Sequence, residues 1–292
     1  MSEDKEIYFH QQWIGLLQPV GLVVSPPALV KAGASIDRDL SIEWQSIFKE
    51  LIQFSEDFES ELSGRAHIKE LKELLVNLLG WQIEDLSRDI PTELTVYLPD
   101  YQERLAPDYV VNDFETKRPL ILIQEFNLGA DLDEPTSEKP SGWRVTRQAK
   151  FERLLSETEI PIGLLFNGLE LRLVYAPRGE SSGYISFPFD FMGEVAGRPV
   201  VGALHMLLSA QRLFDVPINN RLPKILADSR EFQANVSTKL ASQVLDALWL
   251  LLGGFQSADS LVDGKLMRNL SLENPQHIYG CLLYTSPSPR DS

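Results

Sequence analysis

Cysteine is almost absent from this chain, because Cys281 is the single cysteine among 292 residues. That count excludes a disulfide framework and a cysteine-based zinc site. Long apolar runs are missing too, since the most apolar stretch, residues 245–252, is too short to span a bilayer. The N-terminus begins with acidic residues and lacks the apolar segment of an export signal. We therefore expect a cytoplasmic protein with no membrane partner.

Positive charge is scarce as well, with 27 Lys and Arg against 42 Asp and Glu and a formal net charge of −15. Phosphate contacts normally require a surplus of Lys and Arg, so this balance argues against a dedicated nucleic-acid binder. A catalytic module that gathers acids around a metal can nevertheless be acidic and take its DNA affinity from a neighbouring domain. The length and the 43% hydrophobic content suit one sizeable core and a second, smaller domain.

Several catalytic signatures do not occur. The chain has no GxGxxG after a strand and no GxxxxGK[ST] phosphate loop. Its four histidines stand singly, without the spacing of metal ligands: His10, His67, His205 and His277. Carboxylates are therefore the main candidates for chemistry.

Hydrophobic periodicity predicts an α/β fold with a mixed sheet flanked by helices and followed by a helical region. Helices are expected at 66–79, which Gly80 is placed to end, and at 143–155. Strands are expected at 94–98, 108–111, 120–126, 160–166, 169–175 and 184–187, and Asn167-Gly168 is a strong hairpin signal. Strand 120–126 has almost no polar face, so it should lie inside the sheet between strands 108–111 and 160–166.

Four parts are expected along the chain. Residues 1–60 should form an N-terminal arm packed on the core, with a helix around 44–54, and residues 61–192 the α/β domain. Helical patterns at 200–213, 231–252 and 258–270 indicate a helical connector over 193–280. Residues 281–292, CLLYTSPSPRDS, differ from everything before them and are expected to be a non-native tail. The chain would then be the front part of a longer protein.

Two carboxylates stand at the ends of neighbouring predicted strands. Asp108 precedes the strand residues YVV, and Glu125 lies near the end of LILIQEF. Mg²⁺ prefers oxygen ligands and usually takes one or two carboxylates, with water and substrate filling its remaining positions. A metal there could activate water and offset charge during phosphodiester hydrolysis. Asp108 and Glu125 are therefore candidate Mg²⁺ ligands, although such pairs also occur in α/β domains that bind no metal.

Further polar residues surround this pair in the sequence. Glu73, on helix 66–79, could support the metal site or pair with Lys69 four residues earlier. Gln148, on helix 143–155, could bind near the scissile bond through its amide. The same helix carries cations three residues apart, which form either a DNA-binding stripe or a solvated face: Arg144, Arg147, Lys150 and Arg153.

Several segments together resemble the N-terminal region of type IIG-like restriction-modification proteins. They are FHQQWIGLLQPVGLVVSPPALV, APDYVV, LIQEFNLGADLD, the basic helix, and PIGLLFNGLELRLVYAPRGESSGYISF, which is the most specific. The resemblance covers roughly residues 8–280. It implies a PD-(D/E)xK nuclease domain and a helical connector ahead of an adenine-N6 DNA methyltransferase that uses S-adenosylmethionine. The methyltransferase motifs are not in this chain, so the resemblance alone implies methylation.

By that resemblance Asp108 and Glu125 are the metal ligands and Gln148 is an active-site amide. The family places a lysine two residues after the second carboxylate, whereas this chain has Asn127. Asparagine is neutral and shorter, so it cannot supply the lysine's charge. Either Lys150 reaches into the site, or the domain has lost cleavage and kept binding. The alternative function is a non-catalytic module that docks DNA or partner subunits in a phage-defence complex.

Overall fold

The computed structural model describes residues 3–54, 63–136 and 142–265. The chain divides into two compact units, Met1–Phe232 and Gln233–Ser292. Every strand of the described residues lies in the first unit, and helix α8 (Leu222–Leu261) belongs to both. All the candidate site residues therefore fall within the first unit, which also contains the first sixty residues.

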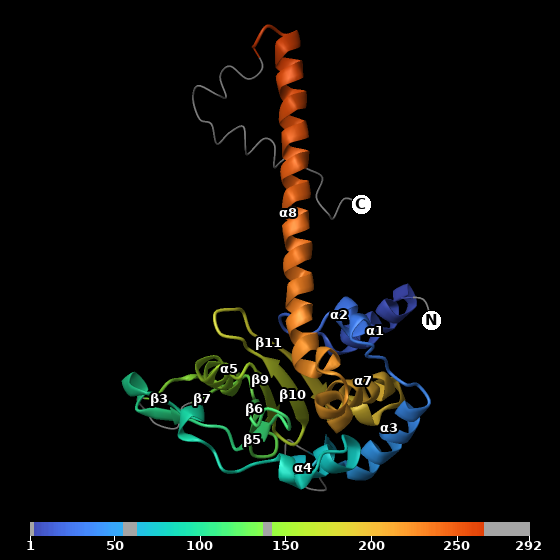
Figure 1. The fold of residues 1–292 in the computed structure, drawn as a ribbon, viewed down its shortest axis with the longest axis vertical. Helices are drawn as coiled ribbons and strands as arrows, with labels where there is room; N and C mark the ends of the chain where they lie inside the picture. The colour runs from blue at the N-terminus through green and yellow to red at the C-terminus, as the bar shows by residue number, and fades with distance from the viewer. Residues whose placement is uncertain (1–2, 55–62, 137–141, 266–292) are drawn as a thin grey trace. The chain divides into compact units, whose positions relative to one another are not determined.

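A five-stranded mixed sheet lies at the centre of the first unit, in the order β11-β10-β9-β6-β5 (Figure 1). Its strands are β5 (Tyr109–Asn112), β6 (Pro119–Glu125), β9 (Ile162–Phe166), β10 (Glu170–Tyr175) and β11 (Gly183–Pro188). β6 and β9 run parallel, whereas the other neighbouring pairs are antiparallel. The mixed α/β class is confirmed, and so are the two neighbours expected for strand 120–126.

Three short antiparallel ladders accompany the sheet. They pair β1 (Gln53–Phe54) with β2 (Ala66–His67), β3 (Val96–Leu98) with β4 (Glu103–Leu105), and β7 (Pro135–Thr136) with β8 (Val145–Thr146). In the main sheet, β9 and β10 are joined through the expected Asn-Gly turn. Gly168 has a φ of 80°, and the Asn167 side chain accepts hydrogen bonds from two following backbone N–H groups, both at 2.9 Å. The hairpin is therefore fixed by local chemistry.

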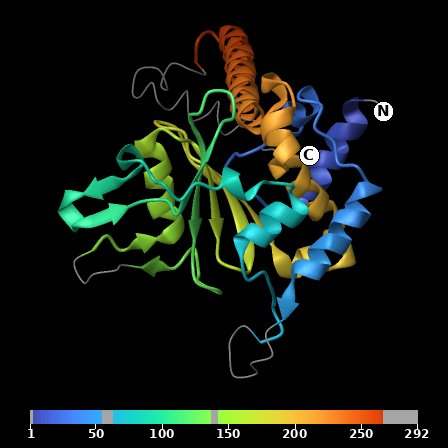
Figure 2. The same cartoon turned by 60° about the horizontal axis from the view of Figure 1, so that its bottom comes forward.

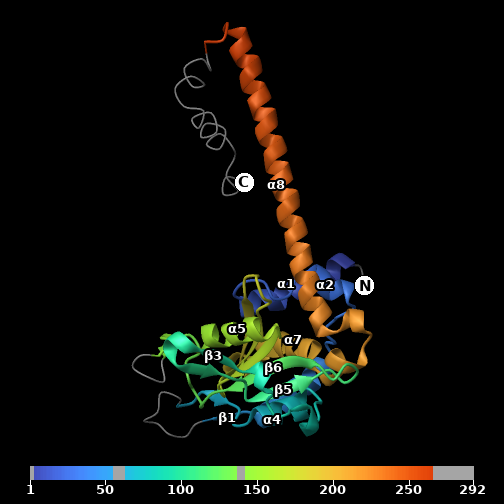
Figure 3. The same cartoon turned by 60° about the vertical axis from the view of Figure 1, so that its left-hand side comes forward.

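Helices cover both faces of the sheet (Figures 2 and 3). α5 (Arg147–Thr158) covers one face, where Phe151 and Leu155 pack against β-strand residues such as Leu122 and Leu165. The other face carries the larger core, which includes Ile121, Ile123, Leu164, Leu171 and Phe187. The alternation of side chains along β6 supplies both faces, and this is why its sequence is almost wholly apolar.

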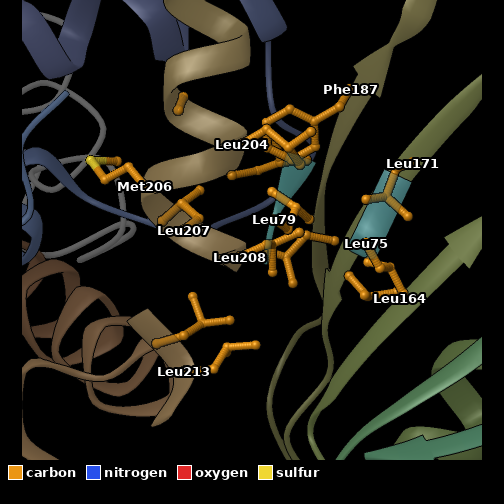
Figure 4. Packing of buried hydrophobic residues seen from close by; sticks show 14 of the residues in the cluster. Leu75, Leu79, Leu164, Leu171, Phe187, Leu204, Met206, Leu207, Leu208 and Leu213 are labelled. Atoms are coloured by element: carbon orange, nitrogen blue, oxygen red, sulfur yellow. The ribbon is translucent and has the colours of Figure 1, made fainter. Parts of the chain in front are cut away.

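The larger core is built by helices from both ends of the first unit. They are α1 (Glu3–Leu17), α2 (Pro26–Lys31), α3 (Leu40–Leu51), α4 (Leu71–Glu73) with the π-helical turn η1 (Leu74–Leu78), α6 (Phe189–Gly193), α7 (Arg198–Leu208) and the π-helical turn η6 (Gln211–Asp215). Figure 4 shows Leu75 and Leu79 between β-strand residues Leu164 and Leu171 and helix residue Leu204. Trp13, Leu29 and Phe48 are fully buried in the same core. Described residues between Trp13 and Phe48 thus contribute directly to this core.

Two predicted helices begin later than their periodicity suggested. Ala66 and His67 pair with β1, and the N–H of Ile68 donates to the Gly168 carbonyl, so the first helix starts only at Leu71. The helix expected from residue 143 starts at Arg147, where Thr146 caps it by accepting from the N–H of Ala149 at 3.0 Å. In both places the residues ahead of the helix pair as a strand, β2 with β1 and β8 with β7, and this pairing replaces the first helical turn.

Helix α8 also differs from the expectation. It runs from Leu222 to Leu261 as one element, whereas the sequence suggested a loop to residue 224 and separate helices at 231–252 and 258–270. Its first turns are buried through Leu222, Ile225 and Leu226. Residues 266–270 and the tail 281–292 lie outside the described residues. No described helix combines the length and the apolar character needed to cross a membrane.

Because of His205 on α7, we expect the free energy of unfolding to depend on pH. Its ring stacks on Trp44 of α3 at a centroid distance of 3.8 Å, and burial lowers the pKa of His205 to about 4. The unfolded chain, with an ordinary histidine pKa near 6.5, therefore binds the proton first as the pH falls. We therefore expect the protonation of His205 to have little effect on the free energy of unfolding above pH 6.5. At pH 5 it should lower that free energy by about 1–2 kcal/mol.

Urea unfolding of the wild type and of His205→Phe at pH 7.5 and pH 5 measures the effect of His205. The carboxylates titrate alike in both proteins, so their effect on the free energy of unfolding cancels in the difference. Equal pH dependence in both proteins would show that His205 does not contribute.

Candidate functional site

Asp108 and Glu125 lie at the same end of the β5-β6 pair. The backbone N–H of Asp108 donates to the carbonyl of Ile123 at 2.8 Å. In turn, Oδ2 of Asp108 accepts from the backbone N–H of Glu125, also at 2.8 Å. The antiparallel register, which pairs Tyr109 with Ile123, puts the start of β5 beside the end of β6. The structure thus brings together the two residues predicted as metal ligands.

Tyr109 and Arg88 extend this pair into a hydrogen-bonded chain. The Tyr109 hydroxyl donates to Oε2 of Glu125 at 3.0 Å and accepts from Nη2 of Arg88 at 2.8 Å. Burial raises the pKa of Tyr109, so its hydroxyl remains protonated and can donate at neutral pH. The hydrogen bond to Tyr109 raises the pKa of Arg88, and the charges of Glu125 and Asp108 raise it further. A cation is therefore held beside the two carboxylates.

A second cation lies near the same ring. Nζ of Lys72 is 5.7 Å from the centroid of Tyr109, compared with 5.1 Å for the guanidinium carbon of Arg88. Neither Arg88 nor Tyr109 was expected as a site residue. Strand alternation could have indicated Tyr109, because it lies opposite Ile123 and therefore on the face of Glu125. Arg88 belongs to a segment with no regular pattern, so nothing in the sequence pointed to it.

Glu73 lies next to Lys72 in α4 and is half-buried. Among the described residues its carboxylate makes neither the ion pair with Lys69 nor a hydrogen bond with the Asp108/Glu125 pair. The position of Lys72 over Tyr109 places this end of α4 beside β5. A supporting role for Glu73 stays a prediction.

Asn127 follows β6 in an exposed turn. The N–H of Ala130 donates to its carbonyl at 2.9 Å, and the N–H of Gly129 donates to the Asn167 carbonyl, also at 2.9 Å. These bonds direct the chain toward the β9-β10 hairpin immediately after the second carboxylate. Asn127 is neutral, so it adds no charge to the site. Its side chain is exposed, so it can be substituted without disturbing the core.

Lys150 does not replace the missing lysine. Its ammonium forms an ion pair with Glu103 of β4, and both side chains are nearly buried, with 12% and 6% exposed. This pair lies on the α5 side of the sheet, whereas Glu125 shares the opposite face with Tyr109 and Ile123. The structure therefore does not support the explanation that Lys150 reaches into the site in place of a lysine at position 127.

Gln148 is also engaged elsewhere. Its Nε2 donates to Glu152 at 2.8 Å, and its Oε1 accepts from Nη1 of Arg172 at 3.2 Å. Gln148 is buried, and its partner Arg172 lies on β10, two strands away from β6. Its amide therefore supports the packing of α5 rather than the two carboxylates.

The predicted basic stripe is only partly present. Arg144 precedes β8 and is not on the helix. Arg147 donates to the Asp131 carbonyl at 2.5 Å, and Arg153 pairs with Glu157 at 2.6 Å. The charges of Lys150 and Arg153 are thus compensated by carboxylates, whereas Arg147 donates to a neutral carbonyl. Exposed pairs of this kind are weak, so phosphate could still compete for Arg147 and Arg153.

A cavity of about 430 Å³ opens on the α5 side of the sheet, beside the end of β6. Its lining combines three cations and one carboxylate with polar and apolar side chains, among them Glu103, Arg104, Gln124, Phe126, Arg147 and Lys150. The guanidinium of Arg147 lies 5.7 Å from the ring centroid of Phe126. Because Glu103 in the lining pairs with Lys150, the uncompensated charge of this cavity comes from Arg104 and Arg147, and the cavity lies on the face opposite Glu125.

The residues present fit a magnesium ion with a small protein donor set. Among the described residues no group of three or more His, Cys, Asp or Glu side chains gathers as a metal cage. Two carboxylates at one edge, however, suffice for Mg²⁺, which keeps several water ligands and often takes phosphate oxygens. Oδ1 of Asp108 and Oε1 of Glu125 accept no hydrogen bond from the described residues, so both are available to an ion.

Comparison of the chain with protein-family models, with curated proteins and with solved structures finds no match. The similarity to PD-(D/E)xK nucleases and to restriction-modification proteins thus stays a prediction from the sequence.

Proposed function

We propose that the first unit hydrolyses DNA phosphodiesters with Mg²⁺, as the nuclease-like part of a bacterial restriction-modification protein in phage defence. The observation that supports this most is the convergence of Asp108 and Glu125 at one sheet edge, with a cation beside them. Adenine-N6 methylation with S-adenosylmethionine belongs to the same proposal for the whole protein and involves residues outside this chain. DNA is the proposed partner, with further subunits of a defence complex.

Each residue of the edge has a defined part in this proposal. Asp108 is fixed by the Glu125 backbone, and Glu125 is oriented by the Tyr109 hydroxyl, so each carboxylate keeps one oxygen directed by the protein and one free. A bound Mg²⁺ supplies activation of water and neutralisation of phosphate charge. In hydrolysis the water oxygen bonds to phosphorus, the bond from phosphorus to one sugar oxygen breaks, and that oxygen takes up a proton.

The test is metal-dependent stabilisation of the protein. We expect millimolar Mg²⁺ or Mn²⁺ to raise the melting temperature, because an ion bound only by the folded state stabilises it by roughly 2.7 kcal/mol at a concentration one hundred times its Kd. Asp108→Ala should abolish this rise together with any cleavage of duplex DNA. Asp100→Ala is a matched control, since Asp100 is exposed in the 3-10 turn η4 (Pro99–Tyr101). A melting temperature that ignores both metals in every protein would contradict the proposal.

The alternative is a non-catalytic module that docks DNA or partner subunits. Asn127 favours it, as do the ion pairs of Lys150 with Glu103 and of Arg153 with Glu157, which reduce the free positive charge of α5. This module would bind without any metal requirement, so the same titration separates the two functions.

A further inference from the structure

Arg88 is held at the carboxylate edge by an addition to the sheet. Ser87 forms an isolated antiparallel bridge with Val110 of β5, through N–H to carbonyl bonds of 3.0 and 2.9 Å. The segment before β3 therefore runs along the outer side of β5. Arg88 follows Ser87 directly, so its backbone position is fixed beside the start of β5, where Asp108 lies.

The side chain of Arg88 is directed by Tyr109 and remains largely free. Nη2 donates to the Tyr109 hydroxyl, which in turn donates to Glu125, so the guanidinium lies one hydroxyl away from the carboxylate. The other donors of Arg88 have no hydrogen-bond partner among the described residues, and the side chain is exposed. A guanidinium offers a planar fork of N–H donors that matches phosphate oxygens, and it stays charged at every relevant pH.

We propose that Arg88 supplies the positive charge that Asn127 does not, by binding a phosphate oxygen of the DNA at the Asp108/Glu125 edge. This inference rests on the proposed hydrolysis and names the group that contacts the substrate phosphate. The charge enters from the segment beside β5 instead of from β6. Lys72 is the other cation near Tyr109, but it makes no hydrogen bond to Tyr109 or to either carboxylate among the described residues.

The inference is tested by removing the charge of Arg88 and placing a new positive charge at residue 127, just after β6. Arg88→Gln should lower the rate of Mn²⁺-dependent DNA cleavage by about a hundredfold or more, the usual loss when one group that stabilises transition-state charge is removed. Adding Asn127→Lys to this variant should recover most of the rate, because it restores an ammonium beside the same carboxylates. Arg118→Gln is the matched control: an exposed arginine at the opposite end of β6, where cleavage should not change.

Metal binding separates this inference from the proposed function. Arg88→Gln should keep or enlarge the Mn²⁺-induced rise in melting temperature, because it removes a cation near the two carboxylates, whereas Asp108→Ala should abolish the rise. A wild type that neither binds Mn²⁺ nor cleaves DNA would overturn the proposed function, and the inference with it. Unchanged cleavage in Arg88→Gln, or no recovery on adding Asn127→Lys, would overturn the inference alone. The same holds if Lys72→Gln, and not Arg88→Gln, loses activity.

Binding gives a second readout for a chain that binds metal but does not cleave. In Ca²⁺, fluorescence anisotropy with a labelled duplex should show about five- to tenfold weaker binding for Arg88→Gln than for Arg118→Gln, since a charge-assisted contact to phosphate is lost. Equal affinities of the two variants would overturn the inference under those conditions.

Discussion

Replacing Arg172 by methionine is expected to lower the free energy of unfolding by about 3–5 kcal/mol, the usual cost of leaving a buried charge without its partner. Arg172 is 4% exposed on β10 and holds several acceptors together. Its two terminal nitrogens bind both oxygens of Asp133 at 2.9 and 3.0 Å, and Nη2 also binds Glu170 at 3.1 Å. Its guanidinium carbon lies 4.2 Å from the ring centroid of Tyr184.

The loss arises mainly at Glu170. Burial raises the pKa of this carboxyl, and the charge of Arg172 opposes that rise. In Arg172→Met the rise is unopposed, so the folded state favours protonated Glu170 while the unfolded chain does not. Stability should therefore recover as the pH is lowered from 7 toward 5, which is opposite to the trend expected from His205. A second change, Glu170→Gln, should restore much of the stability at pH 7, because it removes the unpaired charge.

Arg178→Met is the control for this series. Its ion pair with Glu159 has both side chains more than 60% exposed, so it should change stability by less than about 1 kcal/mol. Urea unfolding at pH 7 and pH 5 measures all four proteins. A small loss in Arg172→Met with no pH dependence would mean that Asp133 and Glu170 are solvated well enough without the arginine.

The sheet could be predicted from the sequence because its signals are local. Strand 120–126 is apolar on both faces, and Asn167-Gly168 specifies its turn by residue type alone, so the neighbours of β6 follow with little ambiguity. The start of the first predicted helix could not be predicted in this way. Ile68, Leu71 and Leu75 have helical spacing, yet residues 66–68 pair with β1 and with Gly168, and these are contacts of long sequence separation.

In the candidate site, too, the residues fixed by local signals could be predicted and those fixed by long-range contacts could not. Asp108 and Glu125 could be predicted because strand ends are visible in the sequence and the register of one hairpin brings them together. Arg88 could not, because its place depends on the bridge between Ser87 and Val110. Lys150 shows the converse: its charge and helical position were evident, but its partner Glu103 lies 47 residues earlier in the chain. Residue type reveals which groups can act, whereas long-range pairing determines which remain free to do so.

Trp13→Ala is expected to destabilise the first unit by about 3–5 kcal/mol, the range for removing a fully buried large aromatic side chain. Trp13 lies on α1 and is 0% exposed in the core that also covers the sheet. Its Nε1 donates to Nδ1 of His10 at 3.1 Å, while Nε2 of His10 bonds the Ala34 carbonyl at 2.9 Å. Burial lowers the pKa of His10, which keeps the ring neutral and able to accept. The substitution therefore leaves both a cavity and a buried nitrogen without its donor.

The urea curve of Trp13→Ala shows whether the N-terminal residues unfold together with the sheet or separately from it. Val20, just after α1, exchanges two backbone hydrogen bonds with Tyr184 of β11, at 3.0 and 2.8 Å, so this segment extends the sheet edge as well as packing on its face. An independent arm would unfold separately, and Trp13→Ala would then add an early transition to the urea curve without moving the main one. We expect a single transition that shifts as a whole, whereas Leu16→Ala, on the same helix but 48% exposed, should shift it by less than about 1 kcal/mol. Because α1 and β11 share one core, losing Trp13 should weaken the whole first unit, including the edge that carries Asp108 and Glu125.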